Sequence, residues 1–163
     1  MLKRISKSSA LASGGAIAIV ASEYNGRYVG AMLRAAKAEL KRAGAKSVQI
    51  VRVPGAFEIP VVAARLAHDA HPRLSVIICL GVILRGATTH AQHIGEVVSR
   101  ELGSIAVASG IPVIHEVLLL ENEEQARQRC LDKGHNRGRE AAQTALKMAR
   151  VMGRLNSASD VPF

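Results

Sequence analysis

The chain has 163 residues, of which 48% are hydrophobic and 21% charged, a balance typical of a globular protein and not of a disordered one. Its net charge of +9 favours an anionic ligand, and the segment from Arg127 to Arg154 holds eight basic and two acidic residues, a net +6. None of the four aromatic residues lies in that segment, which argues against nucleic-acid binding because such proteins use aromatic rings for base stacking.

The N-terminus has basic residues followed by small apolar ones, as in a signal peptide, but Ser13, Gly14 and Gly15 interrupt the apolar stretch. We expect a disordered basic arm over residues 1–15, one domain over 16–156 and a flexible tail over 157–163, in a cytoplasmic protein. No apolar run approaches the ~18 residues of a membrane span. Cys79 and Cys130 lack C-x-x-C spacing, which predicts buried thiols without a disulfide or a zinc site.

Apolar and amphipathic segments alternate along the chain. The pattern predicts strands over residues 16–22, 47–53, 75–84 and 112–120. Helices are predicted from Asn25 to Gly44, over 61–71, over 89–109, from a cap at Asn122 with Gln125 three residues on, and over 139–155. The inner face of the helix over 89–109 is expected to hold Ile94, Val97, Val98, Leu102 and Ile105. The alternation predicts an α/β protein with a parallel sheet covered by helices on both faces.

Three unusual segments follow the first three predicted strands: "SEYN", "PGAFEIP" and "RGATTH". Ligands of parallel sheets bind beyond the carboxyl ends of the strands, so these segments are expected to form one site. Tyr24 and Phe57 offer flat faces to a planar ring or are ordinary hydrophobic contacts. Glu58 is placed to accept hydrogen bonds from hydroxyl groups or to stabilise the first turn of a helix.

The segment "RGATTH" lacks a complete nucleotide motif, because Ala87 and Thr88 stand where a P-loop requires Lys and Ser or Thr. The backbone N–H groups at the start of this helix and the hydroxyls of Thr88 and Thr89 predict a phosphate-binding site. The alternative is that either threonine only caps the helix. His90 lies in the first helical turn, where the dipole disfavours imidazolium and favours a neutral base. His90, His93 and Glu96 recur at spacing three, but that spacing drifts around the helix. We therefore expect no metal and a structural or interface role for His93.

A basic cluster lies around "KGHNRG" near the C-terminus. Guanidinium groups match phosphate oxygens, so the cluster predicts either a phosphate site or a subunit contact. Its members are Arg127, Arg129, Lys133, Arg137 and Arg139.

Four motifs together resemble the lumazine synthases, a family of riboflavin biosynthesis. They are "VPGAFEIP" (53–60), "LGVILRGATTHAQHI" (80–94), "IPVIHEVLLLENEEQARQR" (111–129) and "GHNRGREAAQTALKMA" (134–149). The resemblance extends from about Ala16 to Arg154 and implies a three-layer flavodoxin-like fold. It also implies a pentamer with active sites between neighbouring subunits. The reaction implied joins 5-amino-6-(D-ribitylamino)uracil to 3,4-dihydroxy-2-butanone 4-phosphate, releasing phosphate and water, without metal or organic cofactor.

The resemblance also implies roles for individual residues. Tyr24 corresponds to the aromatic residue that stacks on the pyrimidine, and His90 to the histidine that transfers protons. Ribityl and ring contacts are implied for Ala56, Phe57, Glu58, Val82, Ile83 and Leu84. Ala87 and Thr88 match the phosphate-binding turn, and Arg129 the phosphate-binding arginine of the neighbouring subunit.

Some positions differ from the family pattern. His115 stands where an aromatic residue is usual, facing the pyrimidine from the next subunit, and Glu116 stands where glycine is common. These differences leave open a non-catalytic flavin-binding or shell-forming relative. The absence of an insertion between Arg129 and Gly138 leaves open a decamer or an icosahedral shell, with riboflavin synthase as a possible partner.

Overall fold

The computed structural model describes residues 15–159, so the expected arm before Gly15 and the last four residues lie outside it. Four parallel strands form one sheet in the order β2-β1-β3-β4. The strands are β1 (Ala16–Ser22), β2 (Val48–Val53), β3 (Leu74–Leu84) and β4 (Val113–Leu120). The prediction of a parallel α/β sheet flanked by helices is confirmed, and each strand lies within one residue of its predicted bounds.

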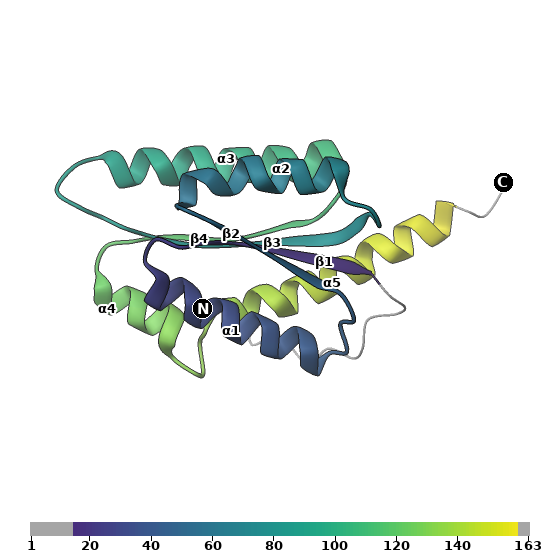
Figure 1. Ribbon diagram of the computed structural model, residues 1–163, viewed down its shortest axis with the longest axis horizontal. Helices are drawn as coiled ribbons and strands as arrows, with labels where there is room; N and C mark the ends of the chain where they lie inside the picture. Colours follow the sequence, from purple (N-terminus) through teal and green to yellow (C-terminus); the bar gives the residue numbers. More distant parts are fainter. Residues whose placement is uncertain (1–14, 160–163) are drawn as a thin grey trace.

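Helices cover both faces of this sheet (Figure 1). One face carries α2 (Ile59–Asp69), preceded by the short 3-10 helix η1 (Ala56–Glu58), and α3 (His90–Ser109). The other carries α1 (Gly26–Arg42), α4 (Glu123–Ala126), the π-helical turn η2 (Arg127–Leu131) and α5 (Arg137–Ser159). No helix within residues 15–159 is long and apolar enough to cross a membrane.

Two apolar cores lie on the two sides of the sheet. Ile17, Ile19 and Ala21 pack toward α1 and α5, whereas Ala18 and Val20 pack toward α2 and α3. All of β1 and most of β3 are buried, because a central parallel strand has helices on both faces. This burial explains their nearly continuous apolar sequences.

Both cysteines are buried, unpaired thiols, as predicted. Burial raises the pKa of Cys79 to about 12 and that of Cys130 to about 11, with the nearby Glu116 contributing to the second shift.

Several local predictions need correction. Asn25 precedes α1 but makes no side-chain cap, because its backbone is left-handed (φ 55°) and its amide bonds elsewhere. Asn122 does cap α4, by accepting a hydrogen bond from the Gln125 amide at 3.0 Å. The Gln125 side chain bonds to the amide of Glu121 and not to that of Asn122, so the capping box is incomplete.

The last helix is longer than predicted. It begins at Arg137 because the buried Asn136 accepts hydrogen bonds from the amides of Gly138 (2.9 Å) and Arg139 (3.4 Å). It continues to Ser159, four residues past the predicted end at Leu155. On α3, Val98 and Leu102 are buried as predicted, whereas Val97 lines a cavity.

Candidate active site

A cavity of about 810 Å³ lies at the carboxyl ends of β1, β2 and β3. It is the place where ligands of parallel α/β sheets bind. Nine of the twelve predicted site residues line it: Tyr24, Ala56, Phe57, Glu58, Val82, Ile83, Leu84, Thr88 and His90. It is also lined by Asn25, Gly55, Gly86, Ala91, His93, Ile94 and Val97. The three segments predicted to form one site therefore do meet.

Two aromatic side chains stand on the rim of this cavity. Tyr24 is 74% exposed and Phe57 is 56% exposed, although large apolar rings are usually buried. The loops that carry them are joined by backbone hydrogen bonds from Glu23 N to Val53 O (2.7 Å) and from Tyr24 N to Pro54 O (3.0 Å). Exposed rings on tied loops provide flat surfaces for a planar ligand.

Glu58 lies between the rim and the start of α2. One carboxylate oxygen, Oε2, accepts a hydrogen bond from the Gly55 amide at 2.8 Å. This contact shows the structural role considered above, and it also fixes the carboxylate in the cavity wall. The second oxygen, Oε1, remains available to accept hydrogen bonds from ligand hydroxyls.

Asn25, which was predicted to cap a helix, also lines the cavity. Its Nδ2 donates to the carbonyl of Val82 at 2.8 Å, across 57 positions of sequence. The bond joins the loop after β1 to the end of β3. An asparagine shortly after a strand, a residue type that tolerates the left-handed backbone found here, was the available signal, but its partner could not be read from the sequence.

The segment between β3 and α3 keeps most of its polar groups free. The Arg85 guanidinium pairs with Glu121, with 2.9 Å between Nε and Oε2. The backbone N–H of Arg85 donates to the carbonyl of Leu120 at 2.8 Å, and the two contacts join the ends of β3 and β4. Thr88 Oγ1 accepts only a long contact of 3.4 Å from His90 N, and Thr89 makes no side-chain cap. The helix start therefore offers hydroxyls and unpaired first-turn N–H groups to an anion. Ala87 is absent from the cavity lining, between Gly86 and Thr88, which belong to it.

One face of α3 forms a wall of the cavity. It presents His90, Ala91, His93, Ile94 and Val97. His93, for which a structural or interface role was expected, lies in this wall as well. The spacings of three, four and seven residues from His90 were the signal. Within residues 15–159 no three His, Cys, Asp or Glu side chains form a group that suits a metal ion.

His115 and Arg129 lie outside the cavity of their own chain. His115 is on β4 and exposed, with Nε2 2.8 Å from Ser99 Oγ. Partial burial of the ring lowers the pKa of His115. Arg129 is exposed on η2 and, within the described residues, makes no hydrogen bond or salt bridge. A single chain therefore does not bring His115 and Arg129 to the nine predicted residues that line the cavity.

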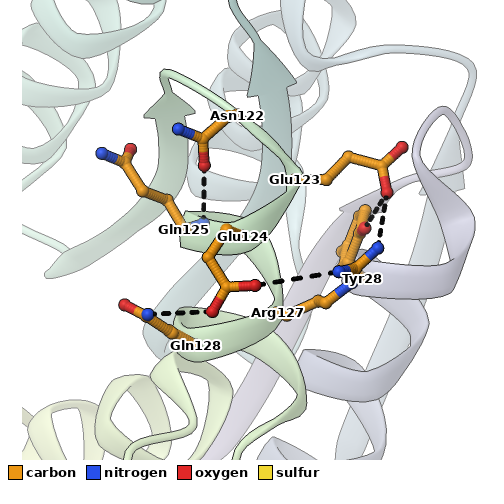
Figure 2. A network of polar contacts seen from close by, with 7 residues as sticks. All are labelled: Tyr28, Asn122, Glu123, Glu124, Gln125, Arg127 and Gln128. Carbon is orange, nitrogen blue, oxygen red and sulfur yellow. Dashed lines mark hydrogen bonds and ion pairs between the residues drawn. The ribbon is translucent and has the colours of Figure 1, made fainter.

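The turn that carries Arg129 is held by a polar network (Figure 2). Tyr28 on α1 donates its hydroxyl to Glu123 at 3.1 Å, and Arg127 contacts Glu123 (3.3 Å) and Glu124 (3.7 Å). Gln128 donates to Glu124 at 3.0 Å. The network uses Arg127 and Gln128, the neighbours of Arg129 on η2, and does not include Arg129 itself.

Glu116 is a half-buried carboxyl behind this turn. Burial raises its pKa to about 7, against the opposing effects of Arg137 and Arg129, while Glu140 adds to the rise. Arg137 is itself paired with Glu140 at 2.6 Å, which limits its attraction for Glu116. A carboxyl with this pKa changes charge near neutral pH, as expected for a half-buried group that makes no hydrogen bond within residues 15–159.

The fold and cavity define an α/β protein with a ligand site at the carboxyl edge of a parallel sheet. The family model described as 6,7-dimethyl-8-ribityllumazine synthase matches residues 14–153. A 6,7-dimethyl-8-ribityllumazine synthase of Syntrophus aciditrophicus (strain SB) is 37% identical over 144 residues, covering 87% of this chain and 92% of that protein. The chain belongs to the 6,7-dimethyl-8-ribityllumazine synthase family.

Proposed function

We propose that the cavity is the substrate site of this transferase, an enzyme of the 6,7-dimethyl-8-ribityllumazine synthase family. In it 5-amino-6-(D-ribitylamino)uracil condenses with 3,4-dihydroxy-2-butanone 4-phosphate. The observation that carries the proposal is the convergence of nine predicted site residues on one cavity of about 810 Å³. That volume lies within the range of small-molecule sites.

The aminouracil lies against the exposed rim. Tyr24 stacks on the pyrimidine, and the wall formed by Val82, Ile83 and Leu84 flanks the ring. The ribityl chain lies along η1, where the free oxygen of Glu58 accepts its hydroxyls while the other stays bonded to Gly55. An ionised acceptor with a fixed position orients the chain more firmly than a mobile one.

The butanone phosphate lies at the start of α3. Its phosphate is held by the Thr88 hydroxyl and the first-turn N–H groups, beside Ala87, and by Arg129 of the adjacent subunit. The 5-amino nitrogen then attacks the ketone carbon. His90 moves the two protons of that nitrogen in turn to the ketone oxygen, which leaves as water, and a C=N bond remains.

The remaining steps complete the balance of atoms. A proton leaves C3 as the bond between C4 of the butanone and the phosphate oxygen breaks, and the resulting enol tautomerises to a ketone at C3 with C4 as a methyl group. The ribitylamino nitrogen then adds to this ketone carbon, closing the ring, and a second water is lost. Each turnover thus releases one phosphate and two waters. Holding the two substrates together supplies more of the rate than His90 does, because proton transfer contributes at the lower end of ~10²–10⁴-fold.

The same proposal includes a cytoplasmic homo-pentamer, with His115 and Arg129 completing the site of the next subunit. It is supported by the exposure of both residues and by their position outside their own cavity. Sedimentation of the purified protein should give a species of five chains or a multiple of five.

The decisive experiment is a steady-state assay of lumazine formation from the two substrates. His90→Ala should lower kcat about 10²-fold. His68→Ala is the matched control, because His68 is exposed on α2 and outside the cavity. A folded wild-type protein without turnover above the spontaneous reaction would overturn the function, and an unchanged kcat in His90→Ala would remove that residue from the mechanism.

A further inference from the structure

Both ring nitrogens of His115 are engaged within the chain. The backbone N–H of Val117 donates to Nδ1 at 3.2 Å, and Nε2 lies 2.8 Å from the hydroxyl of Ser99. Because Nδ1 accepts a hydrogen bond, the proton of the neutral ring is assigned to Nε2, which donates it to Ser99. The ring is left without a free donor or acceptor.

The packing of α3 against β4 makes this arrangement possible. A Cβ atom on Gly95 would lie 3.4 Å from the side chain of Leu119, so the helix runs close to the strand there. One helical turn further, Ser99 meets His115. Within residues 15–159, β4 pairs only with β3, and the His115 ring gives the Val117 amide an acceptor that no second strand of this part of the chain supplies.

We infer that Ser99 is a positioning residue that holds His115 as a flat, uncharged wall for the aminouracil of the neighbouring subunit. The inference rests on the proposed function. A neutral imidazole with both nitrogens occupied presents its ring faces, as phenylalanine does, and adds no competing polar group. The Ser99 contact thus accounts for a histidine at a position where the resemblance implies an aromatic residue.

Five variants, four single and one double, test the inference in the lumazine assay. Ser99→Ala should raise the KM for the aminouracil about three- to tenfold, the loss expected for one hydrogen bond, with kcat and the KM for butanone phosphate within about twofold of wild type. Ser99→Thr keeps the hydroxyl and should restore the KM. Ser104→Ala is the matched control, because the Ser104 hydroxyl donates to Arg100 O of the same helix at 3.0 Å and does not contact His115.

The fourth variant exposes the coupling. His115→Phe should keep a KM near that of wild type, and adding Ser99→Ala to it should change nothing further, because the partner of the serine is gone. A wild-type KM in Ser99→Ala, or an equal increase in both backgrounds, would overturn the inference. Absence of turnover in the wild-type protein would instead overturn the proposed function.

Hydrogen exchange at the Val117 amide gives a readout that needs no substrate. Ser99→Ala loosens the ring that accepts this amide, so its exchange should be faster, while Ser104→Ala should leave it unchanged. Equal exchange rates in wild type and Ser99→Ala would show that the serine does not hold the ring.

Discussion

Two helix starts, α3 at the cavity and α5 behind η2, are built differently. Thr89 precedes α3 without making a side-chain cap, and Gly86 has open space where a Cβ would lie. At α5, Asn136 accepts from two amides, and Gly138 packs against the backbone of α1. Polar groups are left free where a ligand is proposed and are used internally where a surface is held in place.

The two helix starts should differ most in how much a glycine-to-alanine substitution changes the free energy of unfolding. A Cβ on Gly138 would lie 2.0 Å from the carbonyl oxygen of Met32, so backbone must move. Gly138→Ala should lower the free energy of unfolding by about 3 kcal/mol. Gly86→Ala should change it by less than about 0.5 kcal/mol, because no atom lies within 4 Å of the added methyl.

Urea unfolding at one fixed protein concentration measures both glycine variants. Equal losses of stability at the two positions would contradict the close packing of α5 on α1.

The next largest effect is expected for the two arginines of η2. Arg129→Ala should raise the KM for butanone phosphate about 10- to 100-fold, since a charge-assisted bond to phosphate contributes about 1.5–3 kcal/mol. Arg127→Ala, which loses only the surface pairs with Glu123 and Glu124, should leave that KM within about twofold. Steady-state kinetics with the aminouracil saturating separates the two, and similar values would remove Arg129 from the phosphate site.

The sequence predicted the strands and the cavity well, for local reasons. Unbroken apolar runs such as 75–84 are typical of central parallel strands, and the ends of such strands meet at one edge. Tyr24, Phe57 and His90 could therefore be placed together before any contact was known, and the structure places them in one cavity.

The errors came from contacts between distant segments. Asn25 looks like a cap in its own segment, but its partner Val82 lies on another strand. Val97 fits the apolar period of α3, yet its place in the cavity wall depends on how the helix lies across the sheet. The half-buried position of Glu116 likewise follows from the packing of η2 and α5 and not from its neighbours in sequence.

A smaller effect, dependent on pH, is expected at Glu116. Its pKa is raised to about 7, so between pH 4.5 and 7 the folded state binds a proton that the unfolded state lacks. The contribution of Glu116 to the free energy of unfolding is therefore fully present below about pH 4.5. It is lost as the pH rises from 4.5 to 7, the folded pKa. Glu116→Gln removes the charge and should stabilise the protein at pH 8 by about 2 kcal/mol, after allowance for solvent screening.

At pH 5 the Glu116→Gln gain should be much smaller than at pH 8, because most of the penalty of the raised pKa develops between pH 5 and 7. Glu101→Gln, at an exposed carboxylate, is the control and should change stability little at either pH. Urea unfolding at both pH values gives the comparison, and an equal gain at pH 5 and pH 8 would show that titration of Glu116 is not the cause.

The smallest effect is expected at the residues that precede α4 and α3. Asn122 Oδ1 accepts from the Gln125 amide at 3.0 Å, visible in Figure 2, so Asn122→Ala should cost about 1 kcal/mol of unfolding free energy. Thr89 occupies the equivalent position before α3 without such a bond, so Thr89→Ala should cost less than about 0.3 kcal/mol. The urea unfolding midpoints of the two variants show whether each side chain makes a stabilising cap. An equal cost at Thr89 would mean that this hydroxyl caps α3 and is not free for a ligand at the cavity.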